Sequence, residues 1–435
     1  MKTIKSWGRY PNYPQTVKAL NWMKDIDYQV NALSDNFLPF GNGRSYGDSC
    51  LSANDLALGL RTINRFISVD WSTGIIRAEA GVLLSEVLDV AVPRGWFLAS
   101  TPGTKVITLG GATANDVHGK NHHVAGTFGK HVRKFALYRT DMGLLECSPE
   151  ENSELYHATI AGLGLTGVIL WVEIQLRPIK TSLIDSQNIK FANLDEFFDL
   201  SREIDKDFDY TVAWVDCVST GSKLGRGIYM VGNHAEKGTL ELPRSSKLIV
   251  PVDLPFSMVN PLTLKAFNTL YYGKQIAKKV VKTITYEPFF YPLDAILEWN
   301  RIYGKSGFQQ YQCVLPEDNA QVAMKEILTT ISSKKMGSFL AVLKRCGDIA
   351  SPGLLSFPMK GATLALDFPH VDGKTNKLFD QLDTIVMQAG GRLYPAKDAH
   401  MSAEFFQKAY PEWEKLENIR DPKIMSRFWK RVTEK

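Results

Sequence analysis

The sequence predicts an α+β protein of two domains, and three observations support this prediction. At 435 residues the chain exceeds what one ordinary hydrophobic core holds. Its first part reads as short strands and glycine-rich turns with occasional helices. After Pro178 glycine clusters become sparse, and strands alternate with helices as in one antiparallel sheet covered by helices. We therefore expect a first domain over 1–178, a second over 179–388, and a segment, 389–435, that returns to the first domain.

Apolar residues and turn signals place the elements of the first domain. Val17, Leu20, Met23 and Ile26 recur near helical spacing and predict a helix within residues 1–35. A second helix is expected to end near Pro93, since proline and the glycine after it stop helices. In chain order the expected elements are strands 37–40, 56–60, 66–70 and 74–79, helix 84–92, strands 134–140 and 144–147, helix 153–161 and strand 168–176.

The second domain is expected to contain strands 211–215, 227–231, 310–315, 339–343 and 361–367, with helices 194–204, 317–331 and 377–389. Residues 235–285 lack a regular pattern and combine a proline-interrupted apolar run with Lys274, Lys278, Lys279 and Lys282. Two interpretations stay open for them. One is a long surface excursion, and the other is a mobile flap over the site or against a membrane.

Composition and charge narrow the class of protein. The formal charge of +5 is mild and basic residues alternate with acidic ones, which argues against nucleic-acid binding. The chain has five scattered cysteines and no C-x-x-C pair, which argues against disulfides or zinc and for a reducing compartment. The sequence shows neither an apolar signal region nor a run of about eighteen apolar residues, so a cytoplasmic protein is expected.

Two glycine-rich stretches are the strongest functional signal. Residues 41–49 read GNGRSYGDS, and residues 101–133 contain six glycines and four histidines. Clustered glycine indicates positive φ or a close backbone approach to a ligand, and the exposed N–H groups suit phosphate. The first loop matches neither the Walker A nor the Rossmann pattern, and alone it could be a hairpin turn. Together the two stretches predict loops that close on one phosphate-bearing cofactor.

The run His118-Gly119-Lys120-Asn121-His122-His123 invites a metal interpretation. A zincin helix needs H-E-x-x-H, whereas here the glutamate is missing and Gly119 disfavours a helix. We therefore expect no metal. Either these histidines line a ligand site or they satisfy hydrogen bonds in the core.

Segments along the whole chain resemble a known family. They include FGNGRSYGDSCLS, the stretch 101–133, GGRLYPAKD, SWGR near the start, AWVD, KLGR, FYPLD, EWNR, QYQ and DFP. These resemble the FAD-linked oxidases of the vanillyl-alcohol-oxidase superfamily, with a PCMH-type FAD-binding fold and a substrate (cap) domain. Within it the similarity is to the decaprenylphosphoryl-β-D-ribose 2′-oxidase family, for which the His-Gly-Lys-Asn-His-His block is specific.

The resemblance implies FAD between two subdomains, with the second domain covering the flavin ring. Many superfamily members attach the flavin to a histidine in the first loop, where this chain has Arg44. Arginine cannot form that link and suits phosphate, so non-covalent FAD is expected. The implied FAD-binding residues are Gly41, Asn42, Gly43, Arg44, Ser45, Tyr46, Gly47, Asp48, Ser49, Gly103, Thr108, Gly110, Gly111, His118, Gly119, Lys120, Asn121, Val168 and Tyr394.

The resemblance also implies oxidation of a secondary sugar hydroxyl to a ketone, most directly the 2′-OH of a polyprenylphosphoryl-β-D-ribose. Lys397 is the first candidate to contact the reacting hydroxyl, and His118 the second. A lysine acts as a base there only if burial or a cation lowers its pKa. The expected substrate-binding residues are Tyr46, Lys120, Trp214, Tyr291, Gln310, Gln312, Lys344, Ala365 and Lys397.

The implied partners are a lipid-linked sugar phosphate and a separate NAD(P)H-dependent ketoreductase, which would complete an epimerase for cell-wall arabinose. A peripheral membrane contact is a further expectation. Two alternatives stay open: an aldonolactone or alditol oxidase that uses oxygen, and a flavin-binding subunit without turnover. One departure concerns the pocket, since Ala365 and Thr363 stand where the mycobacterial enzymes have cysteine and asparagine.

Overall fold

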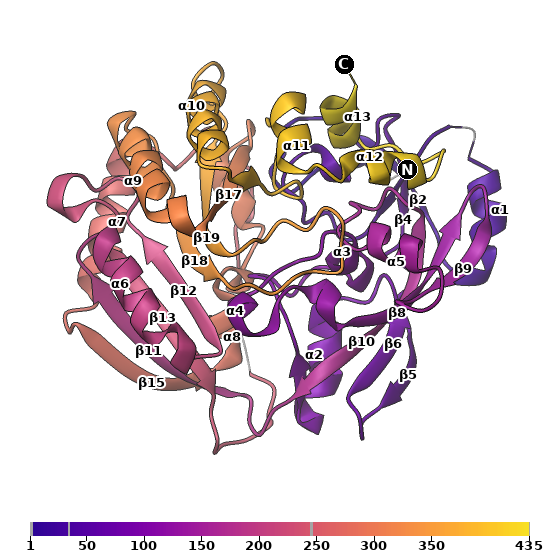
Figure 1. The fold of residues 1–435 in the computed structure, drawn as a ribbon, viewed down its shortest axis with the longest axis horizontal. Helices are drawn as coiled ribbons and strands as arrows, with labels where there is room; N and C mark the ends of the chain where they lie inside the picture. Colours follow the sequence, from indigo (N-terminus) through magenta and orange to yellow (C-terminus); the bar gives the residue numbers. More distant parts are fainter. Residues whose placement is uncertain (1–2, 34, 244–246, 435) are drawn as a thin grey trace.

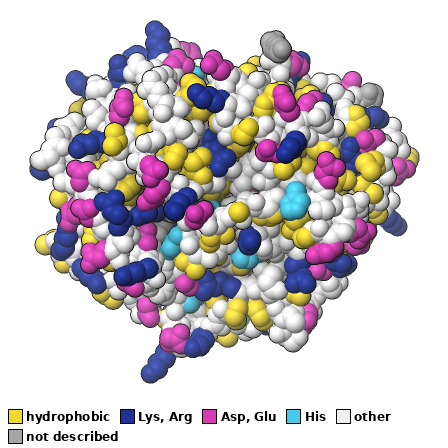
Figure 2. All heavy atoms as spheres, viewed as in Figure 1, with side chains coloured by type: hydrophobic (Ala, Val, Ile, Leu, Met, Phe, Trp, Pro, Cys, Tyr) yellow, Lys and Arg dark blue, Asp and Glu magenta, His cyan; other side chains and the backbone are white. Residues whose placement is uncertain are grey.

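The computed structural model describes residues 3–33, 35–243 and 247–434, and it shows two lobes side by side (Figure 1). Most of the N-terminal part of the chain builds one lobe. The other lobe is a large sheet with helices on it, and the C-terminal helices lie over the first lobe. Basic and acidic side chains are intermixed over the face shown in Figure 2.

The first lobe begins with a small four-stranded sheet in the order β1-β2-β4-β3. Its strands are β1 (Thr3–Ile4), β2 (Gln15–Ala19), β3 (Leu38–Phe40) and β4 (Leu56–Gly59). The helix expected within residues 1–35 is therefore wrong at Val17, which lies in β2, and among the residues described there Ile26–Asn31 form the α-helix α1. The cause is a tertiary contact: Val17 pairs in parallel with Ala57 of β4. Pairing with a distant strand outweighs the helical spacing of the apolar residues nearby in the sequence.

A second, antiparallel sheet carries the rest of this lobe in the order β5-β6-β10-β8-β9, with β7 paired to β10. The strands expected here are confirmed, whereas β7 was not expected. The bounds are β5 (Phe66–Asp70), β6 (Ile75–Glu79), β7 (Trp96–Leu98), β8 (Val132–Arg139), β9 (Gly143–Cys147) and β10 (Val168–Pro178), with helices α2 (Leu84–Ala91), α3 (Leu109–Ala114), α4 (His122–Ala125) and α5 (Ser153–Thr159).

The second lobe is built on an eight-stranded antiparallel sheet in the order β15-β11-β13-β12-β18-β19-β17-β20, as the alternating pattern predicted. The expected strand at 339–343 is displaced, because the chain pairs only from Val342 onward. The strands are β11 (Leu183–Phe191), β12 (Tyr210–Val215), β13 (Gly227–His234), β15 (Lys279–Thr285), β17 (Phe308–Pro316), β18 (Val342–Cys346), β19 (Gly361–Pro369) and β20 (Arg392–Leu393), and the predicted helices are α6 (Leu194–Ile204), α9 (Glu317–Ser333) and α10 (Thr375–Gln388).

The expectation of an irregular segment over 235–285 is wrong for its second half. Residues Pro261–Lys274 form α7, and β15 pairs with β11 at the sheet edge. The Asn260 side chain accepts hydrogen bonds from the backbone N–H groups of Leu262 and Thr263, and Pro261 occupies the first turn. The adjoining segment contributes β14 (Leu248–Ile249), which pairs in parallel with β16 (Ile296–Leu297), and the short helix α8 (Tyr286–Phe290).

The C-terminal segment connects the two lobes. Its strand β20 extends the eight-stranded sheet, and its helices α11 (Ala403–Ala409), α12 (Trp413–Ile419) and α13 (Arg427–Thr433) follow. Single bridges join Phe37 to Ile424 and Ser52 to Ser426, so this segment also contacts the first lobe. None of the described helices is long and apolar enough to cross a membrane. The division of the chain at 178 and 388 stays a prediction.

Candidate active site

One large cavity of about 1220 Å³ is lined by residues of both lobes. Its walls are the loop 41–46, parts of 102–120, the cap segment 285–299 and residues of β17, β18 and β19. Typical small-molecule pockets measure about 300–1,000 Å³, so this cavity has room for a cofactor together with a substrate.

The glycines of the two loops form a cradle that larger residues would fill. A Cβ on Gly41 would lie 2.4 Å from Oγ1 of Thr108, so only glycine lets the first loop approach the second. Thr108 in turn caps α3, because its Oγ1 accepts a hydrogen bond from the Gly111 N–H at 3.1 Å. A Cβ on Gly103 would meet nothing within 4 Å, which leaves the backbone there open toward the cavity.

Two buried polar groups in this cradle fit an anionic cofactor. Among the described residues, the Arg44 Nε and the Ser49 Oγ have no hydrogen-bond partner, and both residues line the cavity. The Arg44 guanidinium lies 3.9 Å from the centroid of the Trp7 ring, which fixes its plane. Burial lowers the pKa of Arg44, although arginine stays charged. The residues present therefore fit FAD, with Arg44 and Ser49 placed to bind its phosphates.

Most of the predicted cofactor residues line the cavity, namely Gly41, Asn42, Gly43, Arg44, Ser45, Tyr46, Ser49, Gly103, Thr108, Gly110, Gly111, His118, Gly119, Lys120 and Tyr394. The other four lie behind it and shape its walls. Asp48 forms an ion pair with Arg431, and a Cβ on Gly47 would lie 1.6 Å from the Asp398 carbonyl oxygen. Asn121 donates to the Ala99 carbonyl at 2.7 Å, and Val168 is buried within β10.

Lys397 enters the cavity from the C-terminal segment. Its Nζ lies 3.6 Å from the centroid of the Tyr46 ring, and the side chain lines the cavity. Burial lowers the pKa of Lys397 to about 8, against the opposing effect of the Asp367 carboxylate. Near neutral pH a measurable fraction of the amine is therefore neutral and able to accept a proton.

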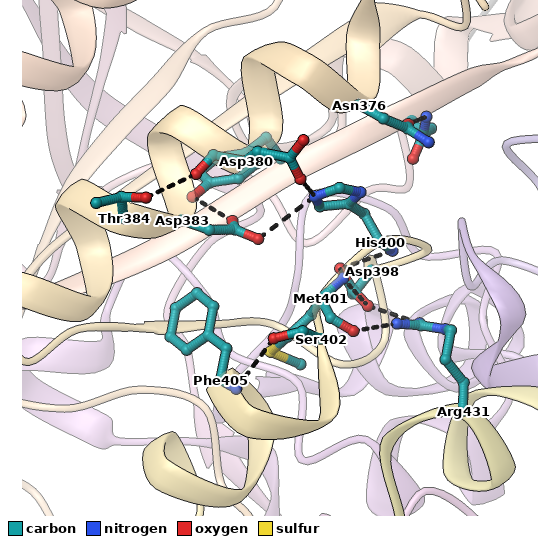
Figure 3. A network of polar contacts seen from close by, with 12 residues as sticks. Asn376, Asp380, Asp383, Thr384, Asp398, His400, Met401, Ser402, Phe405 and Arg431 are labelled. Carbon is teal, nitrogen blue, oxygen red and sulfur yellow. Dashed lines mark hydrogen bonds and ion pairs between the residues drawn. The ribbon is translucent and has the colours of Figure 1, made fainter. Parts of the chain in front are cut away.

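A network of polar contacts fixes the residues that follow Lys397 (Figure 3). Arg431 on α13 donates to both carboxylate oxygens of Asp48 at 2.9 Å and to Asp398 at 2.8 Å. His400 Nε2 lies 3.0 Å from Asp380 and 3.5 Å from Asp383, both on α10. Lys397 is thus held between the first glycine loop, the C-terminal helices and the second lobe. The role of Arg431 could not be predicted, because its partners lie far away in the chain.

His118, the second catalytic candidate, is engaged on both ring nitrogens. The Lys344 Nζ donates to His118 Nδ1 at 2.9 Å and to the Gly119 carbonyl at 2.6 Å. Burial, and then the charge of Lys344, hold the pKa of His118 well below its ordinary value. The ring is therefore neutral, and its Nε2 lies 3.2 Å from the side-chain amide nitrogen of Gln312. This arrangement suits orientation better than proton uptake, so Lys397 is the better placed acceptor.

The predicted substrate residues all line the cavity: Tyr46, Lys120, Trp214, Tyr291, Gln310, Gln312, Lys344, Ala365 and Lys397. Lys120 Nζ donates to the Phe289 and Phe290 carbonyls at 2.7 and 3.2 Å, and burial, followed by the charge of Lys344, lowers its pKa to about 7. Ala365 on β19 lies opposite Gln312 on β17. Thr363, the other departure from the mycobacterial pattern, also lines the cavity.

Two acidic residues of this site were not predicted. Asp294 accepts from the Thr104 hydroxyl at 2.7 Å and from the Lys105 N–H at 2.9 Å, and so joins the second glycine stretch to the cap. Asp367 accepts from the Gln310 side chain at 2.6 Å. Asp294 belongs to the segment FYPLD and Asp367 to the segment DFP, and both segments carry the family resemblance. That resemblance could have identified the two residues as part of the site. Within the described ranges, no group of three or more His, Cys, Asp or Glu side chains is arranged to hold a metal ion.

Comparison with known proteins agrees with this geometry. A family model described as an FAD binding domain matches residues 26–148. The chain is 34% identical to the decaprenylphosphoryl-β-D-ribose oxidase of Mycolicibacterium smegmatis, over 97% of this chain and 95% of that one. It is 30% identical to a protein of Streptomyces coelicolor from the mprA 5′ region, over 78% and 95%. It is also 30% identical to the L-gulonolactone oxidase of Scyliorhinus torazame, over 38% and 36%.

Proposed function

The chain belongs to the decaprenylphosphoryl-β-D-ribose oxidase family of FAD-dependent oxidoreductases acting on CH–OH groups, and from this premise we propose that it oxidises the 2′-hydroxyl of a polyprenylphosphoryl-β-D-ribose to a ketone. The observation that carries the proposal is the placement of Lys397 in the same cavity as Lys120, Lys344 and the neutral His118. One side chain can take a hydroxyl proton, and the others suit a phosphate-bearing sugar.

The chain's own residues supply binding and proton transfer. Lys397 accepts the proton of the reacting hydroxyl in its neutral form, which its lowered pKa makes available near neutral pH. Lys344 and Lys120 line the cavity, and an anionic substrate would favour their protonated forms, so they suit such a substrate. His118 and Gln312 offer hydrogen bonds to the sugar hydroxyls. When bound, FAD supplies the acceptor for the hydride that leaves the sugar carbon.

The same proposal includes a partner enzyme and a contact with the membrane. A 2′-ketone becomes the epimeric alcohol only if a reductant returns hydride to its other face, so a separate NAD(P)H-dependent ketoreductase would complete an epimerisation toward cell-wall arabinose. A lipid-linked substrate also calls for access to a membrane. In support of this, α7 and its neighbours expose apolar side chains, with Leu262, Leu270 and Ile276 at 81%, 74% and 94% exposure. Phe267 and Tyr271 of α7 line the cavity itself.

A second candidate is oxidation of a free aldonolactone or alditol with oxygen, favoured by the similarity to L-gulonolactone oxidase. Such substrates are uncharged and gain nothing from Lys120 and Lys344.

Product analysis separates the two candidates. Holoenzyme would be incubated with polyprenylphosphoryl-β-D-ribose and an artificial electron acceptor, and the product reduced with borodeuteride. Deuterium at C2′ is expected, whereas deuterium at another carbon, or turnover only of free lactones and polyols, would contradict the proposal.

A further inference from the structure

Four cavity-lining side chains form a row across the large sheet. In the strand register Gln312 lies opposite Ala365, and Ala365 lies opposite Val342. Val342 in turn lies opposite Trp214 of β12, and all four side chains line the cavity. Since neighbouring strands lie about 4.8 Å apart, the row is about 14 Å long. Its first member, Gln312, contacts His118 at 3.2 Å, and the other three members are apolar.

Lys344 lies beside the point where this row becomes apolar. It is two residues from Val342 on β18, and side chains two apart in a strand point to the same face, about 7 Å from one another. Its Nζ lies 2.9 Å from Nδ1 of His118. A ligand whose anionic group contacts Lys344 can therefore lay an apolar group directly on Val342 and Trp214.

Helix α7 covers the apolar end of the row. Its Phe267 and Tyr271 are four residues apart, so they lie on the same side of the helix, and their rings are stacked at 5.7 Å. The Tyr271 ring centroid lies 4.6 Å from that of Trp214. A buried hydrogen bond of 2.8 Å, from the Asn268 side-chain amide to Asp216, holds the helix beside the end of β12.

Trp214, Phe267, Tyr271 and Val342 together form a surface that we call the apolar strip. It runs from the interior to the outside of the protein, because Trp214 is 5% exposed whereas Phe267 and Val342 are each 39% exposed. A compact apolar group would be held in a closed pocket. A strip that leaves a cationic site and continues to the surface suits a long chain, whose far end lies outside the protein.

We propose that the apolar strip binds the first isoprene units of a polyisoprenyl phosphate ester, with Lys344 at its phosphate group. The inference rests on the proposed function for the sugar that is oxidised. It goes further in assigning the chain its own binding site and its direction, from Lys344 across Val342 and Trp214 and out beneath α7.

The direct test measures how affinity depends on chain length, without any sugar and without membranes. FAD-loaded protein would be titrated calorimetrically with dimethylallyl, geranyl and farnesyl phosphate, each below the concentration at which it forms micelles. Kd is expected to fall by about 10-fold or more from one isoprene unit to three, because the free energy of burial grows with apolar area. A Kd that does not change with chain length, or no binding of farnesyl phosphate, would overturn the proposal.

A matched pair of variants on α7 separates the strip from the general apolar surface. In Phe267→Ser the ratio of the Kd values for dimethylallyl and farnesyl phosphate should fall by about 5-fold or more, because part of the chain loses its apolar contact. Leu270→Ser changes a residue of the same helix that is exposed and outside the cavity lining, and it should keep the parental ratio. An equal fall in both variants would contradict a defined binding site.

A measurement on the parent protein covers the case in which Phe267→Ser does not fold. Farnesyl phosphate carrying a diazirine at its distal end would be irradiated with the FAD-loaded protein, and the adducts located by mass spectrometry. Adducts on α7 or β18 are expected, whereas adducts confined to other segments, or none, would refute the assignment. These ligands contain no sugar, so the outcome is independent of whether a phosphoribose lipid reduces the flavin, which tests the proposed function.

Discussion

At the scale of single residues, Lys397 shows how burial converts an ordinary lysine into an acid–base group. Its ammonium rests on the Tyr46 ring, in a cavity that penalises the charge, so the pKa falls to about 8. An exposed lysine would remain protonated and could only donate. The burial that lowers this pKa comes from both lobes, which explains why the sequence could identify Lys397 but not its charge state.

Replacing Lys397 tests that role. Lys397→Met should bind FAD as the parent does, since Lys397 is not among the predicted FAD-binding residues, but anaerobic flavin reduction by substrate should slow by about 10²-fold or more. Stopped-flow absorbance measures both quantities. Lys360→Met, at a surface lysine, is the matched control and should reduce its flavin at the parental rate. Equal rates in the two variants would remove Lys397 from the chemistry.

Arg44 gives a second prediction at this scale. The family resemblance implies that it stands where related oxidases have a flavin-linked histidine, and its guanidinium is stacked on Trp7 in the cavity wall. Guanidinium binds phosphate through hydrogen bonds and forms no flavin bond. Precipitating the protein with acid should therefore release all the yellow colour into the supernatant. Flavin fluorescence that stays on the denatured polypeptide after electrophoresis would show the opposite.

At the scale of elements, the sequence predicted those whose signals are local. The two glycine loops, α2, α6, α9 and the strands β12, β13, β17 and β19 of the large sheet follow from periodicity and turn residues, whereas β11, β15 and β20 were not predicted. The segment Gln15–Ala19 did not, because its pairing with β4 comes from 40 positions away in the register Thr16↔Leu56. Asp48 was expected to bind the cofactor because it stands in the loop, and its ion pair with Arg431, near the other end of the chain, was not predicted.

The contact between α10 and the C-terminal segment gives a pH prediction. Burial, and then Asp398, raise the pKa of Asp383 to about 8, so the folded protein holds a proton there that the unfolded chain releases above about pH 4. This contribution to stability is complete below the unfolded pKa and is lost as pH rises through about 8. In Asp383→Asn that loss is absent. The difference in Tm, variant minus parent, should therefore increase from pH 5 to pH 8, and differential scanning fluorimetry would measure it. A difference that stays constant over this range would contradict the raised pKa of Asp383.

At the scale of the whole molecule, α7, whose Phe267 and Tyr271 line the cavity, belongs to a segment that is both apolar and basic. The apolar side chains Leu262, Leu270 and Ile276 are exposed, and Lys274, Lys278, Lys279 and Lys282 lie in the same part of the chain. This combination suits a peripheral contact with anionic lipid, where apolar groups insert and lysines attract the headgroups.

Vesicle sedimentation tests this contact. The protein should sediment with anionic vesicles at low salt and be released as salt rises, because surface charges are screened over about 10 Å at 0.1 M. Leu262→Asp with Leu270→Asp should weaken binding, whereas Val322→Asp, an equally exposed apolar site on α9, should not. Equal sedimentation with neutral and anionic vesicles would leave the segment an ordinary surface.

Reduction of the bound flavin under anaerobic conditions tests the central claim most directly, because it needs neither a partner enzyme nor a chosen electron acceptor. Purified holoenzyme would be mixed with polyprenylphosphoryl-β-D-ribose, with the matching arabinose epimer, and with free lactones and alditols. The account predicts that the phosphoribose lipid bleaches the flavin stoichiometrically and far faster than any uncharged sugar. Rapid bleaching by a free lactone or alditol, with none by the phosphoribose lipid, would contradict it.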